Sequence, residues 1–363
     1  MTCWAVLVLT IASCVRIVGL ARNNLLQDIF LENLFFTLNA ILPVVLLILA
    51  GHAIRRFDLL PESFFSQLNR LCFHVCLPVM LFLNIYNVTD ISIIIENKKI
   101  AFFSVAAVVT AFFIGLILVV FSVKKTEQKG VVLQCVFRSN YAIIGLPLAA
   151  CLCNEGTIPM ARACVVAAVS VPIFNVLATI ALSVFTNKKN ISFIEITKKI
   201  LTNPLVLGTL TGILALFIRN ILPQDQNNQP VFTIQRNLPF LYNAIKMISA
   251  TASPIALIAL GGVFSFSAVA KLKNMILLGT TMRLIVIPAI MLTAAWMLGF
   301  REHDFPSLIV LFGTPVAVSS VPMSAEMNGD TELASQLVVW TTIFSSVSLF
   351  VIVFICATVG LVG

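Results

Sequence analysis

Long apolar runs separated by short polar clusters dominate the sequence. A helix needs about 20 apolar residues to cross the hydrocarbon core of a bilayer. Ten runs reach that length when charged clusters and turn residues are taken as their boundaries. They cover residues 35–54, 66–89, 100–122, 130–153, 157–185, 196–218, 238–266, 272–299, 305–327 and 331–360. The pattern predicts an all-α polytopic membrane protein with ten transmembrane helices.

The composition agrees with this class. Hydrophobic residues make up 60% of the chain and charged residues 10%, and the mean hydropathy is +1.05. Such a chain cannot form a soluble domain with a polar surface, so the bilayer is its solvent. The net charge of +8 comes from Lys and Arg clusters between apolar runs, which is typical of membrane-protein loops and does not indicate a nucleic-acid partner.

A further apolar run at Thr2–Val15 is shorter than a span and precedes the first helix. It resembles a signal peptide without its basic region, and Ile11–Cys14 resembles a lipoprotein cleavage site. A peripheral helix or a start upstream of the native one explains the run equally well. We therefore treat residues 1–34 as an N-terminal extension outside the functional argument.

Prolines recur at a nearly constant offset of 161 to 176 residues between the two halves of the chain. The pairs are Pro43 with Pro204, Pro78 with Pro254, and Pro147 with Pro315. Because five helices is an odd number, the second half enters the membrane from the opposite side. We expect a 5+5 inverted repeat, made of residues 35–185 and 196–363 and joined by a short cytoplasmic connection at 186–195.

Two short motifs interrupt the fourth and ninth segments: G-L-P at Gly145–Pro147 and G-T-P at Gly313–Pro315. Proline removes one helical hydrogen bond and clashes with the preceding turn, which frees backbone groups that lipid cannot satisfy. Matching breaks in two repeats are typical of a transporter with its binding site near the membrane midplane. We expect the fourth and ninth helices to be broken and to cross, with half-helix N-termini that attract a small anion.

Polar residues near these breaks are the candidate binding groups. Arg138 is a costly intramembrane charge, although its long side chain could also reach the inner interface. Asn140 lies deeper and needs hydrogen-bond partners, and its amide can donate to a carboxylate. The hydroxyls of the ninth segment could simply bond to their own helix, but two prolines frame them. The predicted substrate-binding residues are Arg138, Ser139, Asn140, Gly145, Pro147, Gly313, Thr314, Pro315, Ser319 and Ser320.

Other chemistries lack support in the sequence. No Asp or Glu lies in the middle of any of the ten segments, which argues against a carboxylate proton relay. The nine cysteines lack the spacing and the histidine partners of a zinc site. No nucleotide-binding glycine loop, metal cluster or nucleophile motif is present. We expect neither an enzyme nor a resident cofactor or metal.

The distribution of positive charge predicts the orientation. If the first helix starts outside, the inner connections hold 11 Lys and Arg residues and the outer side holds 7. This bias places both ends of the ten-helix unit outside the cell.

Three motifs link the sequence to a known family: L-N-R at Leu68–Arg70, C-L-P at Cys76–Pro78 and N-Y-A-I-I-G-L-P at Asn140–Pro147. On these motifs the chain resembles the auxin efflux carriers, which include the plant PIN carriers and bacterial malonate or organic-anion permeases. The resemblance covers about residues 35–360. The connection at 186–195 is short where plant carriers hold a long regulatory loop, so a bacterial relative in the cytoplasmic membrane is the better comparison.

The resemblance implies a fold shared with bile-acid symporters. Helices one, two, six and seven would form a scaffold that makes a homodimer, and the other six would form a moving transport unit. Asn140 would contact the substrate, and Pro147 and Pro315 would lie at the helix crossover.

These observations predict an alternating-access carrier that exports a small carboxylate anion. An inside-negative potential supplies about 2.3 kcal/mol per unit charge per 100 mV, so export needs no coupling ion. A sodium-coupled symporter is the alternative, with ligands drawn from Ser139, Asn140, Ser319 and Ser320. A ligand-sensing membrane domain is an alternative of another class, and a channel is a third. The sequence names neither the anion nor the direction of transport.

Overall fold

A computed structural model of the chain describes residues 43, 45–87, 96–152, 157–185, 198, 201–223, 230–264 and 267–362. Throughout these ranges the elements are helices, and the ranges contain no strand. The predicted all-α class is confirmed. The N-terminal extension 1–34 and the connection 186–195 lie outside the described residues.

Seven helices in the described part are long and apolar enough to cross a membrane. They are α3 (Glu62–Leu71) continued by the π-helical turn η1 (Cys72–Cys76) and α4 (Leu77–Tyr86), α6 (Lys98–Ser122), α9 (Thr157–Val184), α11 (Pro204–Ile221), α13 (Pro239–Val263), α14 (Ser267–Thr281) continued by η3 (Met282–Val286) and α15 (Ile287–Met297), and α18 (Thr331–Thr358). An integral membrane protein follows from this set.

Within the expected segment 196–218, helix α11 begins at Pro204. The Asn203 side chain accepts a hydrogen bond from the Leu205 amide at 2.9 Å and so caps the helix. Pro204 then occupies the first helical position, where its missing N–H costs nothing.

Two further expected segments, 130–153 and 305–327, are interrupted. The first contains α7 (Thr126–Phe137), the π-helical turn η2 (Tyr141–Gly145) and α8 (Leu146–Leu152), and the second contains α16 (Phe305–Gly313) and α17 (Ser320–Glu326). Of the segment expected at 35–54, the structure describes residues 43 and 45–54, and a helix covers residues 45–56. A short helix, α12 (Ile234–Asn237), precedes α13.

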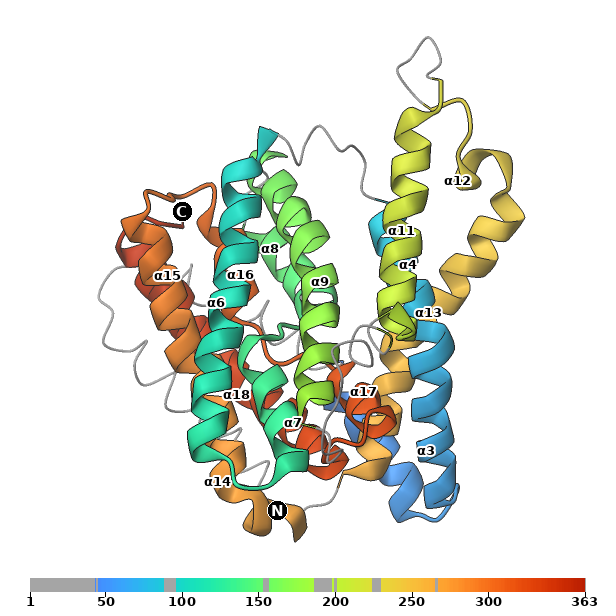
Figure 1. The fold of residues 1–363 in the computed structure, drawn as a ribbon, viewed down its shortest axis with the longest axis vertical. Coiled ribbons are helices and arrows are strands. Elements are labelled where there is room, and N and C mark those ends of the chain that lie inside the picture. Colours follow the sequence, from blue (N-terminus) through green and yellow to red (C-terminus); the bar gives the residue numbers. More distant parts are fainter. Residues whose placement is uncertain are drawn as a thin grey trace.

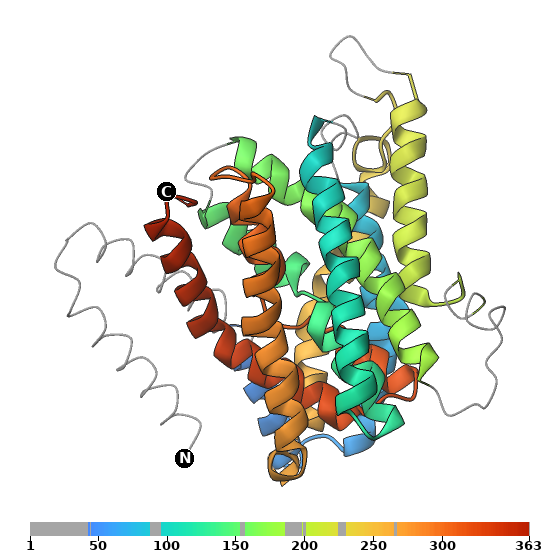
Figure 2. The ribbon, with the colours of Figure 1, turned by 60° about the vertical axis from the view of Figure 1, so that its left-hand side comes forward.

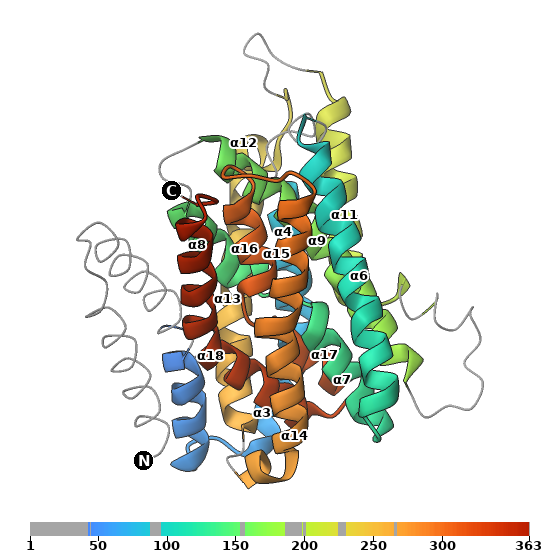
Figure 3. The same ribbon diagram turned by 90° about the vertical axis from the view of Figure 1, so that its left-hand side faces the viewer.

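The helices form two bundles that lie side by side in Figure 1. The smaller bundle contains α3, α4, α11 and α13, and the larger one contains α6, α7, α8, α9, α14, α15, α16 and α18. Helix α17 packs on both, against α7 and α18 on one side and α3 and η1 on the other. Figure 2 and Figure 3 show the long helices running roughly along one direction, as membrane spans do.

Glycines allow close helix packing in the smaller bundle. A Cβ atom on Gly208 of α11 would lie 2.5 Å from the Pro78 carbonyl oxygen of α4. Gly51 and Gly261 meet the backbones of Ile258 and Ile48 in the same way, which joins the helix over 45–56 to α13. Small residues at such contacts let helix backbones approach within a membrane, where van der Waals packing replaces the hydrophobic effect.

Each of the three π-helical turns ends two residues before a proline. The prolines are Pro78, Pro147 and Pro288, at the second positions of α4, α8 and α15. The amide just before each proline donates to the carbonyl five residues earlier, as Leu146 does to Tyr141. The wider turn relieves the clash that a proline causes with the preceding turn, so the backbone stays helical past each of these prolines.

Candidate functional site

The two interrupted segments meet at their breaks. Ser139 and Val316 form an isolated antiparallel bridge, and the Asn140 amide donates to the Pro315 carbonyl at 2.9 Å. The hydroxyls of Ser139 and Thr314 lie 2.5 Å apart. Each break therefore satisfies polar groups of the other, as backbone inside a membrane protein must. We call residues 138–140 and 314–319 together the crossover.

The first break does not lie where the G-L-P motif predicted it. The helix stops at Phe137 and resumes at Tyr141, so residues 138–140 are the non-helical part, and Pro147 lies within α8. The π-helical turn η2 absorbs the proline, while the pairing of Asn140 with Pro315 fixes the break one to two turns earlier. The second break does contain Pro315, and Pro322 lies in the first turn of α17, where proline is tolerated.

Arg138 points into the protein rather than to the inner interface. Only 2% of its surface is exposed, and its guanidinium donates to four neutral acceptors. The acceptors are Gln134 Oε1 at 3.1 Å, Asn175 Oδ1 at 2.9 Å, Ser319 Oγ at 2.8 Å and Met323 Sδ at 3.2 Å. No described carboxylate lies within 4 Å of it. The crossover thus holds a buried positive charge with no counter-ion among the residues that the structure describes.

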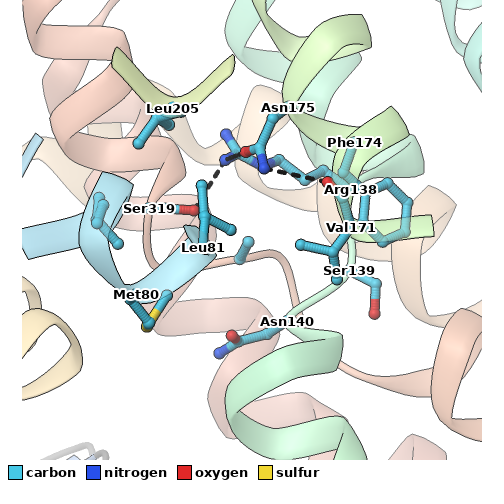
Figure 4. Close-up of a pocket in the computed structure, with 12 residues that line it drawn as sticks. Met80, Leu81, Arg138, Ser139, Asn140, Val171, Phe174, Asn175, Leu205 and Ser319 are labelled. Carbon is cyan, nitrogen blue, oxygen red and sulfur yellow. Dashed lines mark hydrogen bonds between the residues drawn. The ribbon is translucent and has the colours of Figure 1, made fainter. Parts of the chain in front are cut away.

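Asn140 offers a free donor beside this charge. Its residue is 3% exposed, and its side-chain Nδ2 has no hydrogen-bond partner among the described residues. A buried amide left unpaired costs about 1–3 kcal/mol, so such a group is usually satisfied by water or a ligand. Figure 4 shows the amide directed across the site toward Met80.

Arg138 and Asn140 border a cavity between the two bundles (Figure 4). The larger bundle and the crossover supply its polar groups, and α4 and α11 supply an apolar wall. The lining residues are Leu77, Met80, Leu81, Arg138, Ser139, Asn140, Val171, Phe174, Asn175, Leu205, Ala317 and Ser319. The centre of a water molecule can move through about 40 Å³ of this space, which is room for about three waters.

Four of the ten predicted site residues line this cavity: Arg138, Ser139, Asn140 and Ser319. The others build the crossover or its packing. Thr314 pairs with Ser139, the Pro315 carbonyl holds Asn140, and the Ser320 hydroxyl donates to the Ala317 carbonyl at 2.7 Å. Gly145 lies against Val310 and Gly313 against Leu349. Pro147 belongs to α8, and its side chain lies outside the described part.

Sequence reasoning missed two amides that hold Arg138. Gln134 lies one turn before it on α7, and Asn175 lies on α9. Gln134 also donates to the Ser324 hydroxyl at 2.7 Å, which links α7 to α17. The signal was available, because a lone amide inside an apolar run needs a partner for the same reason that Asn140 does.

A second buried arginine, Arg283 of η3, was also missed. It is fully buried, and among the described residues it donates to three backbone carbonyls, those of Thr314 at 2.9 Å, Leu311 at 3.1 Å and Phe137 at 3.5 Å. These carbonyls lie at the C-terminal ends of α16 and α7. The residue stands in the middle of the expected segment 272–299, where a charge is a functional candidate by default.

Comparison with known proteins matches the chain to one family of membrane proteins. Two stretches of the chain, residues 36–190 and 186–353, match the family described as membrane transport protein. Together the two matches span most of the chain, including the crossover and both buried arginines. No curated protein matches the sequence.

Proposed function

Because the chain belongs to the auxin efflux carrier family of membrane transport proteins, we propose that it carries a small organic anion across the membrane by alternating access. The observation that carries this proposal is the buried Arg138 guanidinium, bonded only to neutral groups, at the edge of a cavity between two bundles. A carboxylate entering this cavity supplies the missing counter-charge.

Arg138 and Asn140 would share the recognition of the carboxylate. An ionised acceptor makes shorter and stronger hydrogen bonds than a neutral one, so a carboxylate competes with Ser319 and Asn175 for the guanidinium. The unpaired Asn140 Nδ2 supplies a further donor. The cavity has room for about three waters, so we expect the bundles to separate to admit a larger solute.

The proposed architecture is ten helices in a 5+5 inverted repeat, with the broken fourth and ninth helices crossing at the site. The smaller bundle is the scaffold, and through helices one, two, six and seven it forms a homodimer. The larger bundle moves with the bound anion. The interface position of the cavity supports this division, since a solute there changes sides when one bundle slides past the other.

The proposed location is a bacterial cytoplasmic membrane, with both ends of the ten-helix unit outside. Export driven by the membrane potential is the preferred mode, because an inside-negative potential favours anion exit by about 2.3 kcal/mol per charge per 100 mV. Sodium coupling through Ser139, Asn140, Ser319 and Ser320 is less favoured. Arg138 donates to Ser319 at 2.8 Å, and a cation next to it would be repelled.

Counterflow with the purified full chain in liposomes tests the proposal. Radiolabelled acetate, benzoate and malonate are the probes, and the parent chain exchanges at least one of them. We expect Arg138→Gln and Asn140→Ala to lower that exchange at least about tenfold, since a hydrogen bond to a charged group contributes about 1.5–3 kcal/mol.

Arg236→Gln is the matched control, because Arg236 is exposed on α12, away from the cavity. Exchange in Arg236→Gln should equal that of the parent. The proposal is wrong if none of the three anions is exchanged, or if Arg138→Gln exchanges them at the parent rate. Flux that follows a sodium gradient and ignores an imposed potential would replace export by the symport alternative.

A further inference from the structure

The carbonyl ends of α7 and α16 meet around one buried side chain, Arg283, inside the larger bundle. The last carbonyls of a helix have no partner within it and carry a partial negative charge. Two such ends meeting in an apolar interior repel each other and leave acceptors unsatisfied. Arg283 lies between them, fully buried, and donates to Leu311 and Thr314 from one end and to Phe137 from the other.

Arg283 is linked to Arg138 through one intervening residue and to Asn140 through two. Phe137, whose carbonyl it contacts, directly precedes Arg138. Thr314, whose carbonyl it contacts at 2.9 Å, directly precedes Pro315, and the Pro315 carbonyl holds the Asn140 amide. A planar guanidinium with five N–H donors can bridge carbonyls from two helices, which a single ammonium group cannot match.

We propose that Arg283 is a positioning residue that locks the two broken helices together and so sets where Arg138 and Asn140 stand. It closes the carbonyl side of the crossover, while the opposite side borders the cavity. This inference rests on the proposed function in one respect, namely that Arg138 and Asn140 bind an anion.

Disulfide formation between Ser139→Cys and Val316→Cys reports this geometry without any solute. Residues paired across an antiparallel bridge lie about 4.5–5.5 Å apart at Cα, within the range that a disulfide spans. The full chain carries these two cysteines in a background in which its nine native cysteines are replaced by alanine. We expect fast cross-linking with Arg283 present and at least about tenfold slower cross-linking in Arg283→Met.

The next arginine along the chain, which lies just beyond the end of the same span, provides the control. Arg301 also donates to backbone carbonyls, those of Trp296 and Phe300, but it lies exposed in the loop before α16. Arg301→Met should cross-link as the parent does. Arg283→Lys, which keeps the charge but loses the fork of donors, should fall between the parent and Arg283→Met.

A transport measurement separates positioning from folding. With the probe among acetate, benzoate and malonate that the parent exchanges, Arg283→Lys should raise the apparent KM about tenfold at an equal amount of folded protein in the liposomes. Cross-linking of Arg283→Met at the parent rate overturns the inference. So does a complete failure of both Met and Lys variants to yield folded protein, which assigns Arg283 to folding alone. Because the disulfide forms without a solute, the cross-linking rates still test the role of Arg283 if the proposed anion transport proves wrong.

Discussion

Arg138 and Arg283 are both buried, and their partners in the described part of the chain are all neutral, but the kind of acceptor differs. Arg138 donates to side chains at the cavity, which a solute can displace. Arg283 donates to backbone carbonyls, which a solute does not displace. An ion moved from water into a protein interior loses several kcal/mol of solvation, which its partners must return. Arg138 can therefore exchange its side-chain acceptors for a solute, whereas the hydrogen bonds of Arg283 to the backbone stay in place.

A carboxylate introduced at position 175 should occupy the place of the transported anion beside Arg138. Asn175 Oδ1 lies 2.9 Å from Arg138 Nη2, so Asn175→Asp places a fixed negative charge against the guanidinium. We expect the melting temperature to stay level or to rise, because a buried charge gains a counter-ion, while anion exchange falls at least about tenfold. Thermal unfolding and counterflow measure the two effects on the same preparation.

Asn220→Asp is the comparison for that variant. Asn220 is a partly buried amide of α11 that donates to its own helix at Leu216, away from both arginines. Its exchange should stay at the parent rate. An Asn175→Asp chain that still exchanges the anion fully would show that Arg138 does not receive it.

The sequence identified Arg138 and Asn140 as candidate binding residues, but it did not reveal what surrounds them. Arg138 and Asn140 follow from the rule that polar groups inside a span need a reason to be there. Whether Arg138 turned inward depended on Asn175, which lies 37 positions away, and no local pattern reveals that contact. Arg283 obeys the same rule, and its importance emerges only once the ends of α7 and α16 are known to meet.

At the scale of elements, prolines and glycines shape the helices in different ways. The G-L-P motif correctly marked the fourth segment as irregular, but η2 absorbs Pro147 and the chain leaves the helix at residues 138–140. Proline chemistry alone does not choose between a π-helical turn and a break. Long-range pairing with Pro315 makes that choice, so the position of the break could not be predicted from local sequence.

Close helix packing in the smaller bundle should be sensitive to a single methyl group. The added Cβ of Gly208→Ala would lie 2.5 Å from the Pro78 carbonyl oxygen, and rigid backbone on both sides leaves little room to adjust. We expect a loss of about 1–3 kcal/mol of stability, seen as a lower melting temperature in detergent. Leu214→Ala, at an exposed position of the same helix, should melt close to the parent. An unchanged melting temperature for Gly208→Ala would mean that α4 and α11 do not approach as described.

At the scale of the whole molecule, the cavity lies where two bundles meet. The hydropathy pattern predicted spanning helices but not their division into bundles, which came from the family resemblance. Division depends on contacts such as Gly208 with Pro78 and Gly261 with Ile48, between residues more than 100 positions apart. Hydropathy records only that each helix prefers an apolar environment, and a neighbouring helix and lipid both provide one.

A link between the bundles should stop transport if they move against each other. Helix α17 leads into α18 of the larger bundle, and Glu326 Oε2 at its end lies 4.0 Å from His74 Nε2 of η1, between α3 and α4 of the smaller bundle. Cysteines at these two positions are therefore within reach of a short bifunctional maleimide. In the cysteine-free background, cross-linking this pair should abolish counterflow of the transported probe. Linking Arg162→Cys to Asp304→Cys, which joins α9 and α16 within one bundle, should leave it unchanged. Full transport after the His74–Glu326 link would contradict relative motion of the bundles.

Because the acceptors around Arg138 are neutral, the proposed transport cycle should depend on the membrane potential in a particular way. A site that is cationic when vacant becomes neutral once a monoanion occupies it. The voltage then acts on the reorientation of the unloaded protein, drawing its positive site back toward the negative interior by up to about 2.3 kcal/mol per 100 mV. The anion would be released outside, and the potential would speed the return of the empty site to the inside. Together these two steps would favour net export over import.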